Sequence, residues 1–532
     1  MSTNVIQCES IIPKKIKNLI NEHSSNDSSI VNIIYLLKNE LNIDATFDKD
    51  IVKSYERDYS NIAGKAEALV RPSNDTECAI CLYISQKFKI PLTISAGRTN
   101  LNGSATPMEG IVLSTEKMIS PKVKVDLNNN TAISPVGIQL ESLRNEIQFK
   151  TQKKLYYPVD PTSRNDAMVG GTLSCNASGF VPGEQGATRF WVYGLEIILP
   201  NGYKVSFKRN QYVSKNGFFI FNFGNDNLKM KVPTYKRPKI KNASGPYSNE
   251  NGKIDLVDLI IGSEGIFGFI NSVIFKLKKQ PDDFLDIFFT LKSENDAVNF
   301  YHYINNYFSG DLSKITALEY FGHNCINYMN NKDVLFKSSS FEVGIYLQVP
   351  LYNTNSFDQV ENWYNILDKS KCNIDMNNIF YLNDLRDWEM FFQARHSIPE
   401  NALKKTKKYD TVSILTDTIV PSKNFNNFLE YTHQILKNAK IEYLLFGHLG
   451  DCHLHFHLIP KPDQVYNAKK IYQKIVRKTN SFAGVYSAEH GTGKRKRQDF
   501  LECFGESAVK QIRDAKKILD PNLLLNRGNV FN

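Results

Sequence analysis

The chain has 532 residues, of which 42% are hydrophobic and 23% are charged, and this is ordinary for a globular protein of two or three domains. It contains no run of about 18 apolar residues, and its first residues lack the basic start, apolar core and cleavage site of a secretory signal. Its eight cysteines are scattered, which is typical of a reduced compartment. We therefore expect a cytoplasmic protein without a membrane-spanning helix.

The formal charge of +10 is concentrated in one segment. Residues 203–242 contain ten Lys or Arg and a single acid, Asp226. Such a basic insertion could contact an anionic membrane surface or an acidic partner, or it could simply be solvated. No nucleic-acid recognition motif accompanies the charge, so we expect no nucleic-acid binding.

Residues 1–55 show apolar residues at helical spacing in IPKKIKNLINEHS and SIVNIIYLLKNELNI. From residue 67 the chain predicts short strand, helix, strand units separated by glycine turns, with Ser73 or Asn74 as the cap of the first helix. Cys78 and Cys81 form one CxxC pair in that helix, where core packing is a better interpretation than redox chemistry.

Strand and helix candidates alternate from about residue 281. DFLDIFFTLKS, FEVGIYLQVP and KYDTVSILTDTIV predict strands, and DAVNFYHYINNYF and NFNNFLEYTHQILKNA predict helices. Glycine motifs return after residue 481, and the last predicted helix stops at Asp520-Pro521. We expect an N-terminal helical segment (1–55), a glycine-rich domain (56–280, with the basic insertion at about 203–255), a separate α+β domain (281–480) and a C-terminal segment (481–532) that returns to the glycine-rich domain.

Three segments place glycines beside small polar residues after strand-like runs: TISAGRTNLNG from Thr93, VGGTLSCNASG from Val169 with DPTS from Asp160 before it, and IGSEGIFG from Ile261. Glycine lets a backbone approach a ligand closely, and successive free N–H groups suit a diphosphate. Each segment alone could serve only a tight turn. None fits GxGxxG opening a βαβ unit or the GxxxxGK[ST] loop, which disfavours a nicotinamide-type site and a P-loop.

These segments resemble the FAD domain of the vanillyl-alcohol oxidase (PCMH-type) superfamily. Within it, the chain resembles the D-lactate dehydrogenase, D-2-hydroxyglutarate dehydrogenase and glycolate oxidase subunit branch. The resemblance implies an α+β fold in which two α+β subdomains hold FAD, joined to an α+β cap domain with an antiparallel sheet. Ile266 departs from the usual Thr of the family, and Arg98 from a common Gly. The residues that match the family's FAD contacts are Ser95, Ala96, Gly97, Arg98, Thr99, Asn100, Gly103, Asp160, Pro161, Ser163, Gly170, Gly171, Thr172, Asn176, Gly179, Glu264, Gly265, Gly268 and Asn526.

A second group of candidate functional residues is a cluster of histidines in FGHLGDCHLHFHLIP, which begins at Phe446. His453, His455 and His457 alternate with apolar residues, which predicts a half-buried strand, and two glycines allow His448 to fold back towards its histidine face. SAEHGTG adds Glu489 and His490 on a glycine turn. Two imidazoles and a carboxylate suit zinc, manganese or iron, so these residues alone also allow a metal hydrolase. A structural role is the better interpretation of His457.

The resemblance assigns roles to this cluster, since the branch carries GHxGDGNxH followed by EHG. His448, His455 and Glu489 match the branch's ligands of a divalent metal, and His490 matches its catalytic base. Arg395 matches the arginine that holds the substrate carboxylate, and a planar guanidinium suits that task. Cys452 and His453 replace the motif's Gly and Asn, and we do not expect His453 to add a ligand. Arg527 replaces the usual Pro of the closing segment.

The resemblance thus implies FAD-dependent oxidation of a small D-2-hydroxy acid to the 2-oxo acid, with metal-assisted proton abstraction and hydride transfer to flavin N5. Electrons would pass to an external acceptor: a quinone, a cytochrome, an electron-transfer flavoprotein or oxygen. The basic insertion leaves peripheral membrane contact open, and a homodimer is also open. Three alternatives remain: a same-fold flavoenzyme with non-redox chemistry, as in alkylglycerone-phosphate synthases, a flavin-free metal hydrolase, and a binding protein with a degenerate site.

Overall fold

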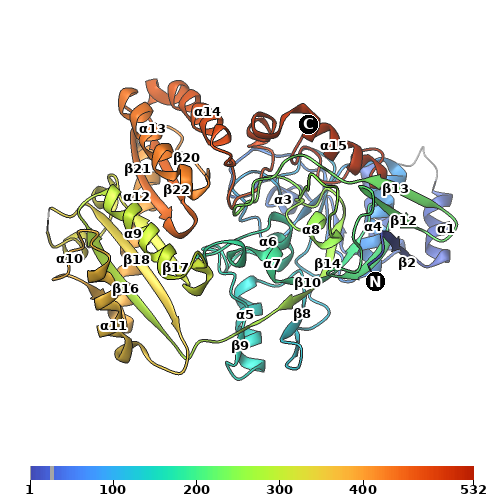
Figure 1. Cartoon of the computed structure of the whole chain (residues 1–532). Coiled ribbons are helices and arrows are strands. Elements are labelled where there is room, and N and C mark those ends of the chain that lie inside the picture. The colour runs from blue at the N-terminus through green and yellow to red at the C-terminus, as the bar shows by residue number, and fades with distance from the viewer. Residues whose placement is uncertain (1, 24–28, 339) are drawn as a thin grey trace.

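The computed structural model describes residues 2–23, 29–338 and 340–532. It forms two lobes (Figure 1). The larger lobe comprises residues up to 279 and from 482 onwards, and the smaller lobe comprises residues 283–481. Mixed helices and sheets in both lobes confirm the α+β class. Of the helices in the described ranges, none is long and apolar enough to cross a bilayer.

Two main sheets build the larger lobe, which lies on the right in Figure 1. The four-stranded sheet is parallel apart from its first strand, in the order β3 (Ala45–Thr46), β4 (Ala68–Val70), β6 (Ile111–Ser114), β5 (Leu92–Ser95). The six-stranded antiparallel sheet has the order β2 (Glu9–Ser10), β11 (Tyr203–Lys208), β10 (Val192–Ile198), β14 (Phe269–Lys276), β8 (Thr131–Pro135), β7 (Lys124–Asp126). One continuous apolar core joins both sheets.

Helix α4 (Asp75–Phe88) packs on the larger lobe for the reasons that its sequence predicts. The Asn74 side chain accepts from the backbone N–H of Glu77 at 3.0 Å, and the Glu77 carboxylate accepts from the N–H of Ser73 at 2.8 Å, which satisfies otherwise unpaired N–H groups. Cys78 and Cys81 are buried free thiols, which agrees with core packing.

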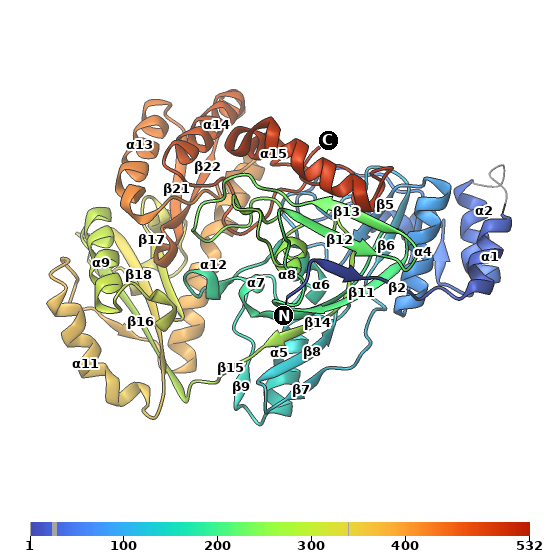
Figure 2. The same cartoon turned by 45° about the vertical axis from the view of Figure 1, so that its right-hand side comes forward.

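The N-terminal segment contains strands as well as the expected helices α1 (Lys14–Glu22) and α2 (Ile30–Tyr35). Strand β1 (Val5–Gln7) pairs in parallel with β12 (Phe218–Asn222) of the basic insertion, and β12 pairs with β13 (Asn227–Lys231). The predicted insertion therefore begins with β11 of the six-stranded sheet and continues as the β12–β13 hairpin and a loop (Figure 2). Residues 24–28, within the predicted N-terminal segment, lie outside the described residues.

The smaller lobe holds a seven-stranded antiparallel sheet. Its order is β19 (Phe380–Tyr381), β16 (Asp283–Leu291), β18 (Val343–Leu351), β17 (Ala317–Phe321), β21 (Glu442–His448), β22 (His453–Ile459), β20 (Ile414–Leu415). One face packs against α9 (Glu294–Tyr307), α11 (Ser356–Lys369), α13 (Phe425–Asn438) and α14 (Val465–Ser481), and the other against α12 (Leu385–Lys408).

Two predictions for this lobe were wrong in detail. Strand β22 is buried on both faces, because Leu454, Phe456 and Leu458 enter the lobe's core on one side. On the other side His453 and His455 lie against Glu489 and His490 of the larger lobe, and His457 pairs with Ser413. The strand expected over 408–420 shortens to β20 because α12 continues to Lys408. Residues 417 and 419 instead form isolated bridges with residues 487 and 485, which brings Asp417 beside the glycine turn that carries Glu489.

Candidate active site

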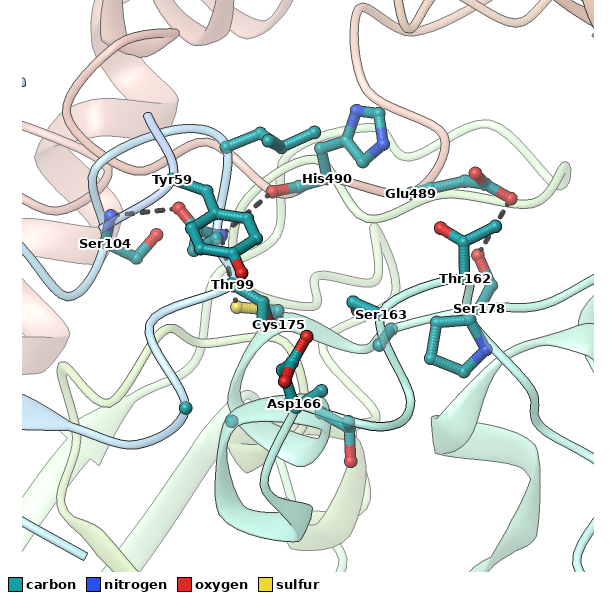
Figure 3. A pocket seen from close by; sticks show the side chains of 18 of the residues that line it. Tyr59, Thr99, Ser104, Thr162, Ser163, Asp166, Cys175, Ser178, Glu489 and His490 are labelled. Atoms are coloured by element: carbon teal, nitrogen blue, oxygen red, sulfur yellow. Dashed lines mark hydrogen bonds between the residues drawn. The ribbon is translucent and has the colours of Figure 1, made fainter. Parts of the chain in front are cut away.

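A cavity of about 570 Å³ lies between the lobes (Figure 3). Both lobes line it, and its volume is in the range of cofactor and substrate sites. Most of the residues predicted to contact FAD lie on its wall: Ala96, Gly97, Arg98, Thr99, Asn100, Asp160, Pro161, Ser163, Gly170, Gly171, Thr172, Gly179, Glu264, Gly268 and Asn526.

The four other predicted FAD residues do not line the cavity but support its walls. Ser95 ends β5 and is fully buried, while the carbonyl of Gly103 accepts from Lys494 Nζ at 3.1 Å. Asn176 ends α6 (Val169–Cys175) with φ +51° and accepts from the N–H of Arg189 at 2.8 Å. At Gly265 a Cβ would lie 2.3 Å from Asn526 Nδ2.

The glycines of the cavity wall let neighbouring segments pack closely. A Cβ on Gly97 would lie 2.2 Å from the carbonyl oxygen of Asp166, and one on Gly171 would lie 3.3 Å from Cβ of Ala96. The first glycine segment therefore packs directly against the second. The buried Ser95 hydroxyl has no hydrogen-bond partner among the described residues. Gly97 and Gly171 also line the cavity, and glycine backbone of this kind suits the diphosphate of a dinucleotide.

Glu264 joins the cavity wall to the turn at Glu489. Its carboxylate accepts from Ser104 Oγ at 2.7 Å and from the backbone N–H groups of Thr492 at 2.6 Å and Gly493 at 2.7 Å. Desolvation is the largest influence on this buried acid and raises its pKa. Glu264 therefore fixes the glycine turn against the first glycine segment.

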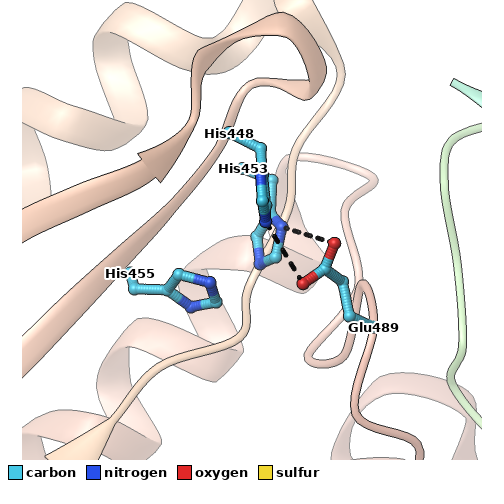
Figure 4. Close-up of side chains that lie close together, drawn as sticks. All are labelled: His448, His453, His455 and Glu489. Atoms are coloured by element: carbon cyan, nitrogen blue, oxygen red, sulfur yellow. Dashed lines mark ion pairs between the residues drawn. The ribbon is translucent and has the colours of Figure 1, made fainter. Parts of the chain in front are cut away.

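His448, His453, His455 and Glu489 offer ligand atoms that all lie within 4.8 Å of one another (Figure 4). His448 ends β21 and stands opposite His453, which begins β22. The turn between them places Cys452 at φ +54°, where the resembled motif has Gly, so the turn survives that replacement. As expected, His457 is not part of this cluster; it pairs with Ser413.

Hydrogen bonds orient two of these rings towards a common point. His448 Nδ1 lies 2.5 Å from Glu319 Oε1, and His455 Nδ1 lies 2.8 Å from the carbonyl of Thr416, to which it donates. Each ring therefore leaves Nε2 for the cluster, as metal-binding histidines do when a second partner holds the other nitrogen. Two such imidazoles with a carboxylate fit zinc, manganese or iron.

His453 also offers an atom within the cluster, and the prediction that it is not a metal ligand stays a prediction. Its Nε2 is 3.1 Å from Asp417 Oδ1, and its Nδ1 is 4.0 Å from Glu489 Oε1. Asp417 also lies 3.4 Å from His490 Nδ1 and 2.8 Å from Lys496 Nζ, and it accepts from the backbone N–H of His490 at 3.1 Å. One buried carboxylate thus positions both histidines.

The charged side chains in and around the cluster are buried and paired with side chains of opposite charge. Burial lowers the pKa of His448, but Glu319 and Glu489 outweigh burial and raise it to about 10. Lys241 comes from the basic insertion, yet it is buried, with Nζ 2.8 Å from Glu489 and 2.9 Å from Asp451. The interpretation of the whole insertion as solvated was therefore wrong at Lys241, because its ammonium neutralises two buried carboxylates.

Arg395 and His490 face the same cavity. Arg395 projects from α12, with its guanidinium 4.6 Å from the centre of the Phe180 ring and Nη2 2.9 Å from Glu319. Within the described residues, its Nη1 and Nε have no hydrogen-bond partner. His490 stacks on His455, with 5.8 Å between ring centres, and burial lowers its pKa.

Sequence reasoning missed Glu319, Asp417 and Lys241. Glu319 stands directly opposite His448 in the β17–β21 pair, and Asp417 and Lys241 come from loops far along the chain. No local motif marks them. An acid in the middle of the apolar strand ALEYF was the one available signal, since a buried charge needs a partner.

Comparison with known proteins gives two family matches. Residues 66–208 match the FAD binding domain family, and residues 313–530 match the family of FAD linked oxidases, C-terminal domain. The chain is 26% identical to D-lactate dehydrogenase of Anaerostipes hadrus, covering 90% of this chain and 93% of that protein. It is 24% identical to D-2-hydroxyglutarate dehydrogenase of Stutzerimonas stutzeri, covering 91% and 95%.

Solved structures agree on the fold. p-Cresol methylhydroxylase with bound substrate has a TM-score of 0.64 at 14% identity, covering 99% of both chains. Alkyldihydroxyacetonephosphate synthase has a TM-score of 0.61 at 15% identity, covering 97% of this chain and 85% of that one. With both FAD-linked families matched in order along its length, the chain belongs to the vanillyl-alcohol oxidase (PCMH-type) superfamily, in which it is similar to D-2-hydroxy-acid dehydrogenases, and it is an FAD-dependent oxidoreductase.

Proposed function

We propose that this chain oxidises a small D-2-hydroxy acid to the corresponding 2-oxo acid. The observation that carries the proposal is that Arg395, His490 and the histidine cluster face the same cavity as the glycine segments. This arrangement supports a site in which Arg395 binds a carboxylate, His490 accepts a proton and the histidine cluster holds a cation beside the cofactor.

The larger lobe holds the cofactor in this proposal. The backbone of Gly97–Asn100 and Gly170–Gly171 would hold the diphosphate and flavin ring, with Asn526 behind them. Bound FAD supplies a two-electron acceptor for the α-hydrogen of the substrate. The chain's contribution is to place the substrate carbon at that acceptor and to keep water out.

Arg395 binds the substrate carboxylate through Nη1, while Nη2 stays on Glu319. An N–H donor of a guanidinium makes a charge-assisted hydrogen bond to a carboxylate oxygen, and the Phe180 ring, whose centre lies 4.6 Å from the guanidinium carbon, limits how the guanidinium can turn. Glu319 therefore acts as the positioning residue for Arg395, and through its other oxygen for His448.

His490 accepts the hydroxyl proton at Nε2. Its Nδ1 faces Asp417, which keeps Nε2 directed to the cavity. A cation held by His448, His455 and Glu489 would supply Lewis acidity towards the hydroxyl, and His453 is placed to join that set. A general base of this kind contributes about 10²- to 10⁴-fold to the rate.

We also propose the four segments 1–55, 56–280, 281–480 and 481–532, peripheral membrane contact through the basic insertion, and a homodimer. Within the described residues the cysteines are dispersed free thiols, so we propose an external acceptor such as a quinone, a cytochrome or an electron-transfer flavoprotein. A flavin-free hydrolase would explain the histidine cluster but not the matched FAD binding domain.

The test is anaerobic reduction of the purified yellow protein by D- and L-hydroxy acids. We expect one or more D-acids to bleach the flavin, and His490→Ala to slow bleaching by about 10²- to 10⁴-fold while FAD content stays unchanged. Chelation followed by addition of zinc, manganese or iron identifies the active ion. A yellow protein that no hydroxy acid bleaches would instead favour the non-redox chemistry of a same-fold synthase.

A further inference from the structure

The cavity wall next to Arg395 is apolar, and we infer from it that the substrate is a 2-hydroxy monocarboxylic acid with an apolar side chain, not a dicarboxylic acid. The inference rests on the proposed function. The two D-acids that the similar dehydrogenases are named for differ in this respect, because D-2-hydroxyglutarate carries a second carboxylate and D-lactate does not.

The wall is formed by side chains from four elements of the smaller lobe and one loop of the larger lobe. Phe321 ends β17, Pro399 lies within α12, Leu415 ends β20 and Phe446 lies in β21, while Phe180 comes from the larger lobe. Leu415 precedes Thr416, whose carbonyl holds His455. The apolar wall therefore begins directly beside the residues that would bind the substrate's hydroxyl end.

A second carboxylate would find no cation on this wall. Among the described residues that line the cavity, the arginines are Arg98 and Arg395. Arg98 lies over the Tyr55 ring at 4.4 Å, beside the first glycine segment, and Arg395 is needed for the first carboxylate. A carboxylate placed against an apolar wall without a partner is strongly disfavoured.

Besides the two arginines, His396 also lines this wall and could contact a second carboxylate through its imidazole ring. Its Nδ1 lies 2.7 Å from the carbonyl of Phe392, and since a carbonyl only accepts, Nδ1 carries the proton. The Phe392 carbonyl thus holds the Nδ1–H group, and Nε2 is the one ring nitrogen that His396 leaves for the cavity.

The experiment compares kcat/KM of the FAD- and metal-loaded enzyme for two series. D-lactate, D-2-hydroxybutyrate and D-2-hydroxyisocaproate form the monocarboxylate series, and D-malate and D-2-hydroxyglutarate form the dicarboxylate series. We expect the best monocarboxylate to exceed both dicarboxylates by about 100-fold or more, the range in which an uncompensated polar group rejects a substrate. L-lactate controls for configuration.

Leu415→Lys places a cation on the wall, and Leu415→Met keeps it apolar. The lysine variant should raise kcat/KM for D-2-hydroxyglutarate relative to D-2-hydroxyisocaproate by about 10-fold or more, whereas the methionine variant should retain the wild-type preference. If wild-type enzyme turns over a D-dicarboxylate as well as or better than every monocarboxylate, the inference is overturned and the proposed function stands. If no acid of either series reduces the bound flavin, the proposed function itself fails and the inference falls with it.

Discussion

The two walls of the cavity are built by different means. The wall from the larger lobe depends on glycines at 97, 170 and 171, which let neighbouring segments pack where a Cβ would clash or be crowded. The wall from the smaller lobe is made of side chains held by other side chains, such as Glu319 between His448 and Arg395. A wall of the first kind depends on the absence of side chains, whereas a side-chain wall depends on partners that lie far apart in sequence.

This difference predicts that a side chain added at a single glycine of the larger lobe's wall will prevent FAD binding. Gly97→Val places a Cβ about where the Asp166 carbonyl oxygen stands, 2.2 Å away, so the first glycine segment must move. We expect the purified variant to contain no FAD, as read from its visible spectrum. The control is Gly310→Asn, in an exposed turn with nothing within 4 Å of its Cβ position; a yellow Gly97→Val protein would contradict this interpretation.

Next to the histidine cluster, Lys241→Met should give the largest loss of stability. The two carboxylates that Lys241 joins, Asp451 and Glu489, would then lose their shared ammonium, and breaking a buried ion pair costs about 3–5 kcal/mol of unfolding free energy. The loss should be smaller in metal-loaded protein, since a cation on Glu489 replaces part of the lost charge. Urea unfolding with and without metal measures both values.

Lys239→Met is the matched control, because Lys239 is exposed two residues earlier in the same loop. If Lys241→Met and Lys239→Met lower the free energy of unfolding equally, the buried ammonium contributes no more to stability than the exposed one. The double variant Lys241→Met with Asp451→Asn should recover part of the stability, since it removes one of the unpaired carboxylates.

A smaller effect is expected from Glu319→Gln, which keeps the shape of the side chain and removes its charge. Residues that orient metal ligands typically affect metal affinity or activity by about 10- to 100-fold. Glu319→Gln should therefore reduce metal content at a fixed free-metal concentration and raise KM as Arg395 loses its orientation. Glu389→Gln, exposed on α12, should change neither, and unchanged metal affinity in Glu319→Gln would remove Glu319 from the site.

The same contrast explains what the sequence could predict. The glycine segments, GHLGD and EHG are contiguous, so their positions on the cavity wall followed from local pattern and resemblance. Glu319 and His448 are 129 residues apart, and Lys241 and Asp451 are 210 residues apart. Such pairs depend on strand register and on how the lobes pack, which no local pattern contains. The two buried faces of β22 were missed for the same reason: polar histidines indicate solvent unless a second lobe covers them.

The closing contacts of the larger lobe bear on when its cofactor can be taken up during synthesis. Asn526 accepts from the N–H of Ile94 and donates to the carbonyl of Glu264, and Asn529 donates to the carbonyl of Ser104. The two partners at Ile94 and Asn526 are 432 residues apart. Translation proceeds at about 5–20 residues per second. Residues 526–529 are therefore synthesised some tens of seconds after the first glycine segment, and their hydrogen bonds to it can form only then. Cofactor loading is thus a late step of biogenesis, and a chain truncated before Asn526 would leave the ribosome with an unbraced pocket.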